Sequence, residues 1–311
     1  MRLSFLTALY NCLPHTQAML ASLRATLPRD LDWELILVDD GSTDGTRDWL
    51  ATLPVEGGRI RFLLQPDNRG FAAANNRAAA TATGDVFALL NNDLVLAPGW
   101  LESMVRALEA RPDAALVGNV QTIAATGAIH HTGLFINARG KPEHDRRRPA
   151  ATDGIRPAVA VTAACALVRR EVFVRLGGFD EAFRNGHEDV DFCLRARAAG
   201  LRSCVALDST VAHHVSVSPG RGNAKIVNAA RSMNRWRDAL PALAGEAWCD
   251  PHLRPVWERR LPWPARLRTL VYRPDRADAA RFPAWLEAGV RHRIARQLAR
   301  WCRELGGTLP A

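Results

Sequence analysis

Polar side chains that can bind a ligand stand directly after three short apolar runs in the first third of the chain. They are Tyr10-Asn11, Asp39-Asp40 and Asn91-Asn92-Asp93. In an open α/β sheet the ligand lies at the carboxyl ends of the strands, so these are the first candidates for a site. Their oxygens suit a divalent cation or the ring N–H of a nucleotide base. Neither G-x-G-x-x-G nor a P-loop lysine occurs nearby, so the sequence favours a metal ion with a base and ribose over a phosphate cradle of backbone amides alone.

A second acidic group, Glu188-Asp189-Val190-Asp191, opens a helix predicted over residues 188–199. At about 100° per residue, Asp189 and Asp191 point roughly 160° apart, so both cannot face one substrate. Asp191 is placed to pair with Arg195 four residues later. The alternative is that all these carboxylates only complement the helix dipole.

The elements that must position these residues alternate along the chain. Apolar runs predict strands over residues 3–9, 33–38, 60–64 and 86–90, and later over 159–168. Helical spacing and capping residues predict helices over 16–27, from about Ser42, over 71–83 and over 98–110. This order is typical of an α/β fold with a largely parallel sheet.

Composition limits the classes of protein. The chain has 311 residues, of which 48% are hydrophobic, which excludes disorder as the main state. No stretch approaches the roughly 20 apolar residues of a membrane span, and the short apolar start is predicted to be a strand rather than a signal peptide. Six cysteines without a Cys-x-x-Cys pair favour reduced thiols. We therefore expect a cytoplasmic protein, or a peripheral one at the inner face of the plasma membrane.

The formal charge of +9 is unevenly placed, with 13 Lys and Arg against 8 Asp and Glu from Asp238 onward. Six of the nine tryptophans lie from Trp236 onward. We expect a catalytic domain over residues 1–237 and a basic, Trp-rich, helical extension over 238–311. A positive charge favours binding to nucleic acid, an anionic membrane or a phosphate-bearing substrate, and the charge alone does not distinguish among these partners.

Seven blocks in a fixed order carry a resemblance to a known family. They are Tyr10-Asn11, Val38 to Gly45, Asn68 to Phe71, Leu90 to Asp93, Gly177 to Glu181, Glu188 to Asp191, and His213 with Ser218. Over roughly residues 3–237 the sequence resembles family 2 glycosyltransferases, and most of all their rhamnosyltransferase-like branch, which has Asn-x-Asp where others have Asp-x-Asp. The resemblance implies the glycosyltransferase A fold, a mostly parallel Rossmann-like sheet with helices on both faces.

The resemblance also implies roles in donor binding. Asp40 would contact the nucleotide base, Asp39 would position the ribose or its loop, and Tyr10 and Asn92 would line the same site. Asp93 and His213 would bind Mn²⁺ or Mg²⁺, and Asp93 would reach the donor diphosphate through the ion. Asn91 replaces the first aspartate of the usual motif by a neutral amide, and His214 has no counterpart in the family. The alternative for Asp39, Asp40 and Asp44 is that they cap the following helix.

On the acceptor side, Asp189 matches the general base of the family and Glu188 the neighbour that orients the acceptor. The implied function is an inverting glycosyltransferase that moves a sugar from a nucleoside-diphosphate donor to a hydroxyl of a saccharide or lipid-linked saccharide in cell-surface polysaccharide synthesis. Asn91 leaves open a non-catalytic module that binds sugar nucleotides or glycans. A nucleotidyltransferase would need a glycine-rich basic loop after the first strand, and no stacking motif supports nucleic acid as a partner.

Near the C-terminus, apolar residues recur at helical spacing among arginines. They are Val290, Ile294, Leu298, Trp301 and Leu305. Such a helix can make peripheral contact with an anionic membrane. The alternative, which the neighbouring tryptophans favour, is that the apolar stripe packs inside the protein and the arginines are a solvated face.

Overall fold

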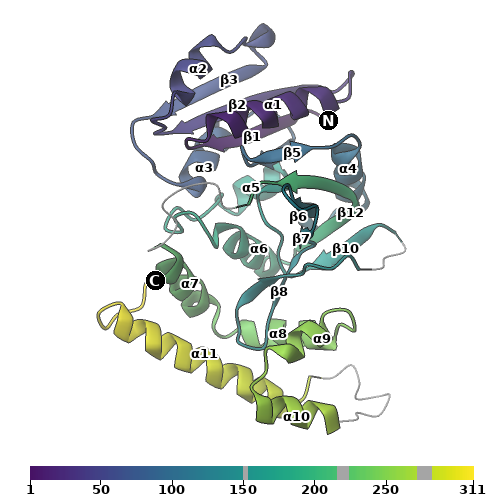
Figure 1. Ribbon diagram of the computed structural model, residues 1–311, viewed down its shortest axis with the longest axis vertical. Coiled ribbons are helices and arrows are strands. Elements are labelled where there is room, and N and C mark those ends of the chain that lie inside the picture. The colour runs from purple at the N-terminus through teal and green to yellow at the C-terminus, as the bar shows by residue number, and fades with distance from the viewer. Residues whose placement is uncertain (150–152, 216–223, 272–281) are drawn as a thin grey trace. The chain divides into compact units, whose positions relative to one another are not determined.

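The computed structural model describes residues 1–149, 153–215, 224–271 and 282–311 (Figure 1). The chain falls into two compact units. The first consists of Met1–Gly133 and Arg146–Ala224, and the second of Leu134–Asp145 and Lys225–Ala311. Each unit is described by itself below.

The first unit begins with the predicted alternation of strands and helices. In chain order these are β1 (Leu3–Leu9), α1 (Leu13–Thr26), β2 (Trp33–Asp40), α2 (Thr46–Thr52), the 3₁₀ turn η1 (Glu56–Gly58), β3 (Ile60–Gln65), α3 (Phe71–Thr81) and β4 (Val86–Leu90). The strands pair in parallel in the order β3-β2-β1-β4, so their carboxyl ends share one edge. The four predicted strands are confirmed within two residues at each end.

Beyond β4 the sheet is mixed. The remaining elements of the first unit are β5 (Leu94–Leu96), α4 (Trp100–Ala110), β6 (Ala114–Ile123), β7 (Ile129–His131), β10 (Ile155–Ala158), β11 (Cys165–Arg169), α5 (Arg170–Arg175), α6 (Glu188–Ala198) and β12 (Arg202–His213). Strand β11 runs antiparallel to β4 and β6, while β12 runs parallel to β6 and antiparallel to β5 and β10. Antiparallel neighbours appear here because a turn joins β6 to β7 and irregular chain leads into β11, in place of crossover helices.

Helices cover both faces of the first strands. Leu3, Phe5 and Leu9 of β1 belong to the core cluster that also holds Met19 of α1 and Trp100 of α4. Helix α3 packs against β1 and β2. Its buried alanines, which allow a close approach, are Ala72, Ala73, Ala74, Ala78 and Ala79.

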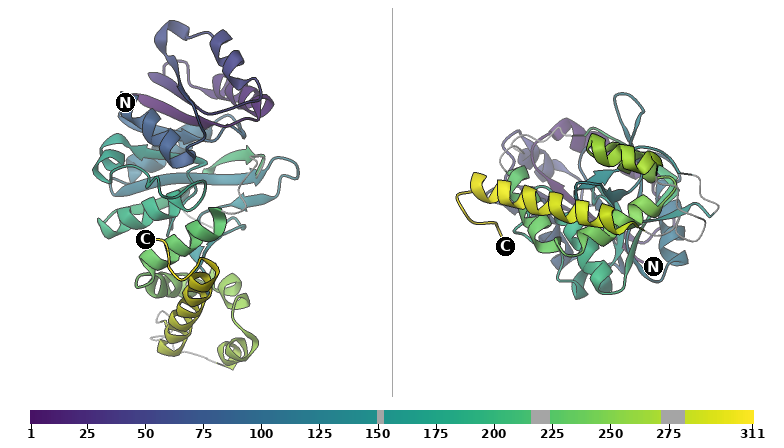
Figure 2. Two further views of the ribbon diagram at one scale, coloured as in Figure 1. Left: turned by 90° about the vertical axis from the view of Figure 1, so that its left-hand side faces the viewer. Right: turned by 90° about the horizontal axis from the view of Figure 1, so that it is seen from below.

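The second unit contains a two-stranded hairpin and helices. They are β8 (Leu134–Ile136), β9 (Pro142–His144), α7 (Ala224–Trp236), α8 (Leu240–Cys249), α9 (Arg254–Arg259), α10 (Trp263–Val271) and α11 (Ala284–Glu304). Helix α8 packs on β8 and on α11, which is a single long helix in both views of Figure 2. Helix α7 binds the end of the chain through Arg231, whose Nε donates to the carbonyl of Ala311 at 2.7 Å. By packing, this unit therefore begins at Lys225 and includes Leu134–Asp145, whereas composition placed the boundary at Asp238.

The apolar stripe of α11 is buried within the second unit. Leu286, Val290, Ile294, Leu298 and Trp301 are all buried, whereas Leu305, the last residue of the predicted stripe, follows the end of α11 and is half-buried. Gly140 lies so close to α11 that a Cβ there would be 2.4 Å from the Ile294 side chain, and Lys141 places its ammonium 4.9 Å from the Trp301 ring. The apolar stripe therefore packs inside the protein, as the second of the two interpretations above expects, because the β8–β9 hairpin and α8 cover the apolar face of α11. No helix in the described part of the chain combines the length and apolar character needed to span a membrane.

Candidate active site

Asp93 and His213 are 120 positions apart in the sequence and lie side by side in the fold. Strand β5 pairs with the end of β12 so that His213 is opposite Leu94, the residue after Asp93. The His213 Nε2 and Asp93 Oδ1 atoms are 3.0 Å apart, and both side chains are largely buried. The strand pairing thus brings together the two residues expected to bind a metal.

Gln121 on β6 orients the His213 ring. Its Oε1 lies 3.1 Å from His213 Nδ1, and its amide nitrogen lies 3.5 Å from Asn119 Oδ1, which assigns the oxygen to the His213 side. With the proton on Nδ1, the lone pair of Nε2 points toward Asp93. In metal sites of proteins a histidine commonly binds the ion through one ring nitrogen while the other nitrogen donates a hydrogen bond that orients the ring. Two adjacent ligands about 2.1 Å from an octahedral ion lie about 3.0 Å apart, so the observed spacing fits Mn²⁺ or Mg²⁺.

The donor set is small. Among the residues that the structure describes, no group of three or more His, Cys, Asp and Glu side chains could hold a metal ion. Two protein ligands agree with ions that keep several waters and bind substrate phosphates. Asn92 donates from Nδ2 to Thr16 Oγ1 at 3.0 Å, which ties the Asn91–Asp93 segment to α1. Ser218 and Arg221, which follow His213 in the sequence, lie outside the described residues.

Asp39 and Asp40 end β2 with their carboxylates buried. Asp39 accepts hydrogen bonds from Arg47 Nε at 2.6 Å and from the Ser42 amide, so it closes the turn after β2. Asp40 Oδ1 accepts from Gln65 Nε2 at 2.9 Å and from the Arg69 amide at 2.7 Å, and its Oδ2 accepts from the Gly70 amide at 2.8 Å. Burial raises the pKa of Asp40.

These bonds make Asp40 the anchor of the loop over residues 65–70. A carboxylate offers about four acceptor positions. The three donors found among the described residues leave one position on Oδ2 for a base N–H. Contact of Asp40 with the nucleotide base therefore stays a prediction, as does a ribose role for Asp39.

The loops after β1 and β2 are tied together beside this anchor. Asn11, in the left-handed region at φ 54°, accepts from the Thr43 amide at 2.8 Å, and its own amide donates to Ser42 Oγ at 2.8 Å. Asp44 accepts from the Leu13 amide at 2.9 Å at the start of α1, so its use is structural. Tyr10 is half-buried directly before Asn11, and its contact with the donor stays a prediction.

Asp189 is held at the start of α6 by two backbone amides. Its Oδ1 accepts from Val190 at 2.8 Å and its Oδ2 from Ala163 at 3.3 Å. The neighbouring Ala164 carbonyl accepts from the Asn91 amide at 2.8 Å, so the turn at Ala163–Ala164 connects the expected base to the expected metal motif. Burial raises the pKa of the Asp189 carboxyl, and the nearby His187 opposes that shift.

The other two carboxylates of α6 bond within the protein. Glu188 accepts from the Gly186 amide at 2.5 Å, which caps the turn before the helix, and its contact with an acceptor stays a prediction. Asp191 pairs with Arg195 at 2.8 Å, and this predicted structural role is confirmed. Arg195 also donates to the Gly178 carbonyl at 2.8 Å, so the ion pair fixes the glycine turn to α6.

Asn76 on α3 holds the same glycine turn from the other side. It accepts from the Phe179 amide at 2.9 Å and donates to the Phe179 carbonyl at 2.8 Å. Gly177 and Gly178 have φ of 74° and 69°, and a Cβ at Gly178 would lie 2.6 Å from Asn76 Oδ1. No local pattern in the sequence indicates this role of Asn76, because its partner Phe179 is 103 residues away.

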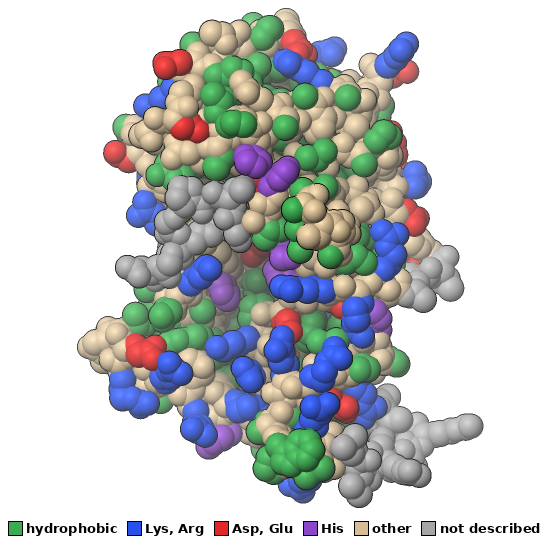
Figure 3. All heavy atoms as spheres, in the orientation of Figure 1, with side chains coloured by type: hydrophobic (Ala, Val, Ile, Leu, Met, Phe, Trp, Pro, Cys, Tyr) green, Lys and Arg blue, Asp and Glu red, His purple; other side chains and the backbone are tan. Residues whose placement is uncertain are grey.

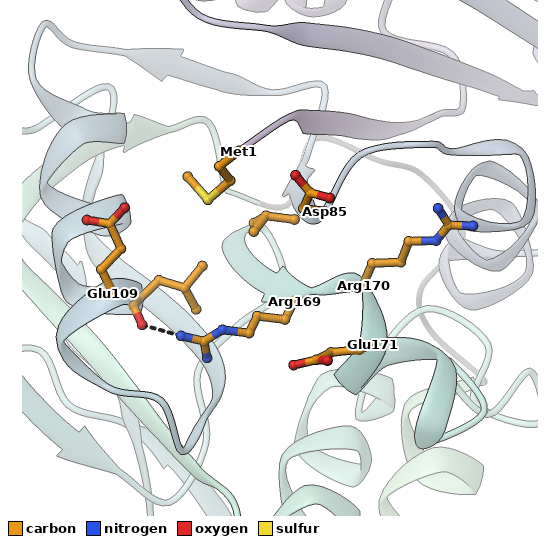
Figure 4. Close-up of a pocket in the computed structure, with 8 residues that line it drawn as sticks. Met1, Asp85, Glu109, Arg169, Arg170 and Glu171 are labelled. Carbon is orange, nitrogen blue, oxygen red and sulfur yellow. Dashed lines mark hydrogen bonds between the residues drawn. The ribbon is translucent and has the colours of Figure 1, made fainter.

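The first unit has two cavities of similar size, and one of them lies near the site. One of about 380 Å³ lies beside the Asp40 loop and is lined by Gln65, Arg69, Ala73, Asn76, Arg77 and Glu181. The other, of about 390 Å³, lies at the amino end of β4, away from the site (Figure 4). Arg169 lines it and donates to the Leu108 carbonyl at 2.6 Å, so this arginine serves to close the end of α4.

Two further histidines, His214 and His130, lie close to the Asp93 and His213 pair. His214 stacks edge to face on His15, with ring centroids 4.7 Å apart. His130 lies 6.5 Å from the His213 ring, and burial lowers the pKa of His130.

The chain is similar in sequence to a known protein family and to several known proteins. The family model described as glycosyl transferase family 2 matches residues 4–177. O-antigen biosynthesis protein RfbC of Myxococcus xanthus is 36% identical over 60% of this chain and 15% of its own length. N-acetylglucosaminyl-diphospho-decaprenol L-rhamnosyltransferase of Mycobacterium tuberculosis is 27% identical over 68% of this chain and 76% of its own length. The chain spans about a quarter or less of the first relatives that it matches.

A solved structure confirms the fold. The crystal structure of GalNAc-T7 with UDP, GalNAc and Mn²⁺ superposes with a TM-score of 0.68 over 100% of this chain and 58% of that chain, at 16% identity. This likeness concerns the fold alone. It bears out the predicted glycosyltransferase A architecture.

Proposed function

Because the chain belongs to glycosyltransferase family 2, we propose that it is an inverting enzyme that transfers a sugar from a nucleoside-diphosphate donor to a hydroxyl of a saccharide or lipid-linked saccharide. The observation that carries the proposal is the position of Asp189. The turn at Ala163–Ala164 bonds to Asp189 on one side and to Asn91 on the other. This arrangement supports the proposal that Asp189 acts as a base beside the diphosphate of the donor.

In this proposal Asp189 removes the proton of the acceptor hydroxyl as that hydroxyl attacks the anomeric carbon. The attack comes from the face opposite the diphosphate, which inverts the configuration. Two backbone amides fix the carboxylate, and its raised pKa makes it a stronger base than an exposed aspartate. Glu188 would orient the acceptor.

The donor lies against Asp40, Asp39, Tyr10, Asn92 and Asp93. Asp93 and His213 would hold Mn²⁺ or Mg²⁺ against its diphosphate, and a bound ion would stabilise the negative charge of the leaving group. Gln121 keeps the His213 ring in the orientation and tautomer that this requires. The Asp40 loop positions the base end of the donor.

The competing function is a non-catalytic module that binds sugar nucleotides or glycans, which Asn91 suggests because a neutral amide replaces an aspartate. Such a module would have no need for a half-buried carboxylate at Asp189 with a raised pKa. It would bind nucleotide and release no nucleoside diphosphate from any donor.

Stereochemistry tests the proposed reaction. With the donor found active by nucleoside-diphosphate release, proton NMR of the first product formed should show an anomeric configuration opposite to that of the donor sugar. A single direct attack assisted by one base requires this result. Retained configuration would contradict the proposal.

We also propose that the enzyme works at the cytoplasmic face of the membrane, where a lipid-linked acceptor would lie. The support is the charge of the second unit, which carries 19 Lys and Arg against 10 Asp and Glu, while the first unit carries 22 of each. In the space-filling view, Lys and Arg side chains gather over the elements of the second unit (Figure 3). Since the apolar stripe of α11 is buried, this contact would depend on charge.

Co-sedimentation with phosphatidylglycerol vesicles measures this contact. The wild-type protein should bind at low salt and dissociate at high salt. The double variant Arg296→Glu with Arg303→Glu, on the exposed face of α11, should bind at least about tenfold more weakly, because each basic residue contributes on the order of 1 kcal/mol near such a surface. The matched control, Arg29→Glu with Arg170→Glu in the neutral first unit, should bind nearly as well as wild type. Absence of binding at low salt by wild type would exclude the membrane contact.

A further inference from the structure

The segment that leads into α6 has an unusual backbone. Asn185, Gly186 and His187 have φ of 58°, 140° and 73°, so three consecutive residues adopt positive φ. Such conformations are disfavoured for residues other than glycine and persist where surrounding contacts impose them. Asp189 follows two residues later. The contacts that impose this backbone therefore also set the position of the expected base.

One of these contacts reaches across to the donor side of the site. Asn185 Oδ1 accepts from the Phe71 amide at 2.9 Å. Phe71 is the first residue of α3, and the two amides before it, from Arg69 and Gly70, donate to Asp40. Three successive backbone amides thus bond to Asp40 on β2 and to Asn185 before α6.

The two segments are closely packed around this bond. Gly70 has φ of 94°, and a Cβ there would lie 3.1 Å from the Arg184 side chain. The Arg184 guanidinium donates to the Asn68 carbonyl. The Phe71 ring lies 5.8 Å from Phe179, which lies 5.4 Å from Phe192 on α6. A shift of the loop over residues 68–71 would therefore be transmitted to the start of α6.

We propose that Asn185 is a positioning residue that couples the donor loop anchored by Asp40 to the helix that carries Asp189. This inference rests on the proposed function, in which Asp40 faces the donor and Asp189 the acceptor. Binding of the nucleotide orders the loop over residues 68–71, and the Phe71 to Asn185 hydrogen bond carries that order to Asp189. Asn suits the position because it tolerates positive φ and supplies an acceptor oxygen.

Two substitutions separate the hydrogen bond from the backbone conformation. Asn185→Gly keeps the positive φ and removes the acceptor, whereas Asn185→Asp keeps an acceptor oxygen on a residue that also tolerates this region. If only the backbone conformation of residue 185 matters, the glycine variant should keep the wild-type activity. If the acceptor oxygen matters, the aspartate variant should keep the activity and the glycine variant should lose it.

Hydrogen exchange by mass spectrometry, with Mn²⁺ and with UDP, dTDP and GDP in turn, provides the measurement. In wild type a bound nucleotide should slow exchange in residues 66–72 and also in residues 186–193. In Asn185→Gly it should protect only the first segment, with kcat lowered at least tenfold and the nucleotide Kd within threefold of wild type. Asn185→Asp should recover the second protection and most of kcat.

Several outcomes would contradict the proposed coupling, and each of them would have a different meaning. Equal protection of residues 186–193 in wild type and Asn185→Gly, or an unchanged kcat, would overturn the coupling and leave the proposed function intact. A Kd that rises as much as kcat falls would also overturn it, since Asn185 would then support only the fold of the donor loop. Absence of protection in wild type by all three nucleotides would remove the donor site itself and this inference with it.

Discussion

Replacement of Asp189 by asparagine should lower the rate of sugar transfer by about 10² to 10⁴ while nucleotide affinity changes no more than a few-fold. The amide is nearly the same size and keeps an oxygen that can accept from the Val190 amide. It cannot take up the acceptor proton. In the proposed mechanism Asp189 acts on the acceptor, so kcat should fall and the Kd for nucleoside diphosphate should stay nearly unchanged, as measured by initial rates and by calorimetry.

The pH profile gives an independent check on the same residue. Aspartate acts as a base only when ionised, and burial raises the pKa of Asp189. Activity should therefore be lost on acidification at a pH above the usual range for aspartate, about 3.9. The matched control is Asp191→Asn, which removes the pair with Arg195; it should lower the melting temperature and leave this acidic limb in place. Near-normal turnover by the Asp189→Asn variant would remove Asp189 from the role of base.

Removal of divalent cations should abolish activity, and Mn²⁺ should restore it. Asp93→Ala should weaken donor binding at least tenfold, because Asp93 and His213 are the protein groups that would hold the ion against the diphosphate. Calorimetry with the donor nucleotide, with and without Mn²⁺, separates the two contributions. The metal-free affinity of the variant should match that of metal-free wild type.

Substitution of Gln121 tests the same metal site with a smaller expected effect on metal affinity. Gln121→Met removes the acceptor for His213 Nδ1 and keeps a similar volume, so it should lower Mn²⁺ affinity about 10-fold to 100-fold. His214→Ala, whose ring packs on His15, should have little effect on metal affinity. Full activity of wild type in excess chelator would show that the site works without an ion and that Asn91 marks a lost metal site.

Local patterns predicted the elements that carry the site. The strands that end at Leu9, Asp40 and Leu90 are buried apolar runs, and a parallel order of such runs fixes which ends meet. The proximity of Asp93 and His213 at one edge of the sheet could be predicted only from the resemblance of the ordered motifs to a known family. No single segment of the sequence indicates a contact between residues so far apart. The pairing of Asp191 with Arg195 followed from helix geometry alone.

Contacts between distant segments escaped prediction. The apolar run over residues 159–168 was expected to be one strand, but the chain turns at Ala163–Ala164 before β11, and that turn holds Asp189. Asn76, Gln121 and Asn185 act through partners about 90 or more residues away, so no nearby residue indicates their roles. Similarly, composition marked a change near Asp238, whereas α7 joins the second unit through contacts with the last residues of the chain.

A donor screen that measures nucleoside-diphosphate release from UDP-, dTDP- and GDP-sugars in the presence of Mn²⁺ tests the proposed function most directly. Purified wild-type protein should release nucleoside diphosphate from at least one donor, faster when a saccharide or lipid-linked acceptor is present, and Asp189→Asn should release it at no more than about a hundredth of that rate. Tight nucleotide binding without release from any donor, or equal release by wild type and Asp189→Asn, would contradict the proposal that Asp189 catalyses sugar transfer at this site.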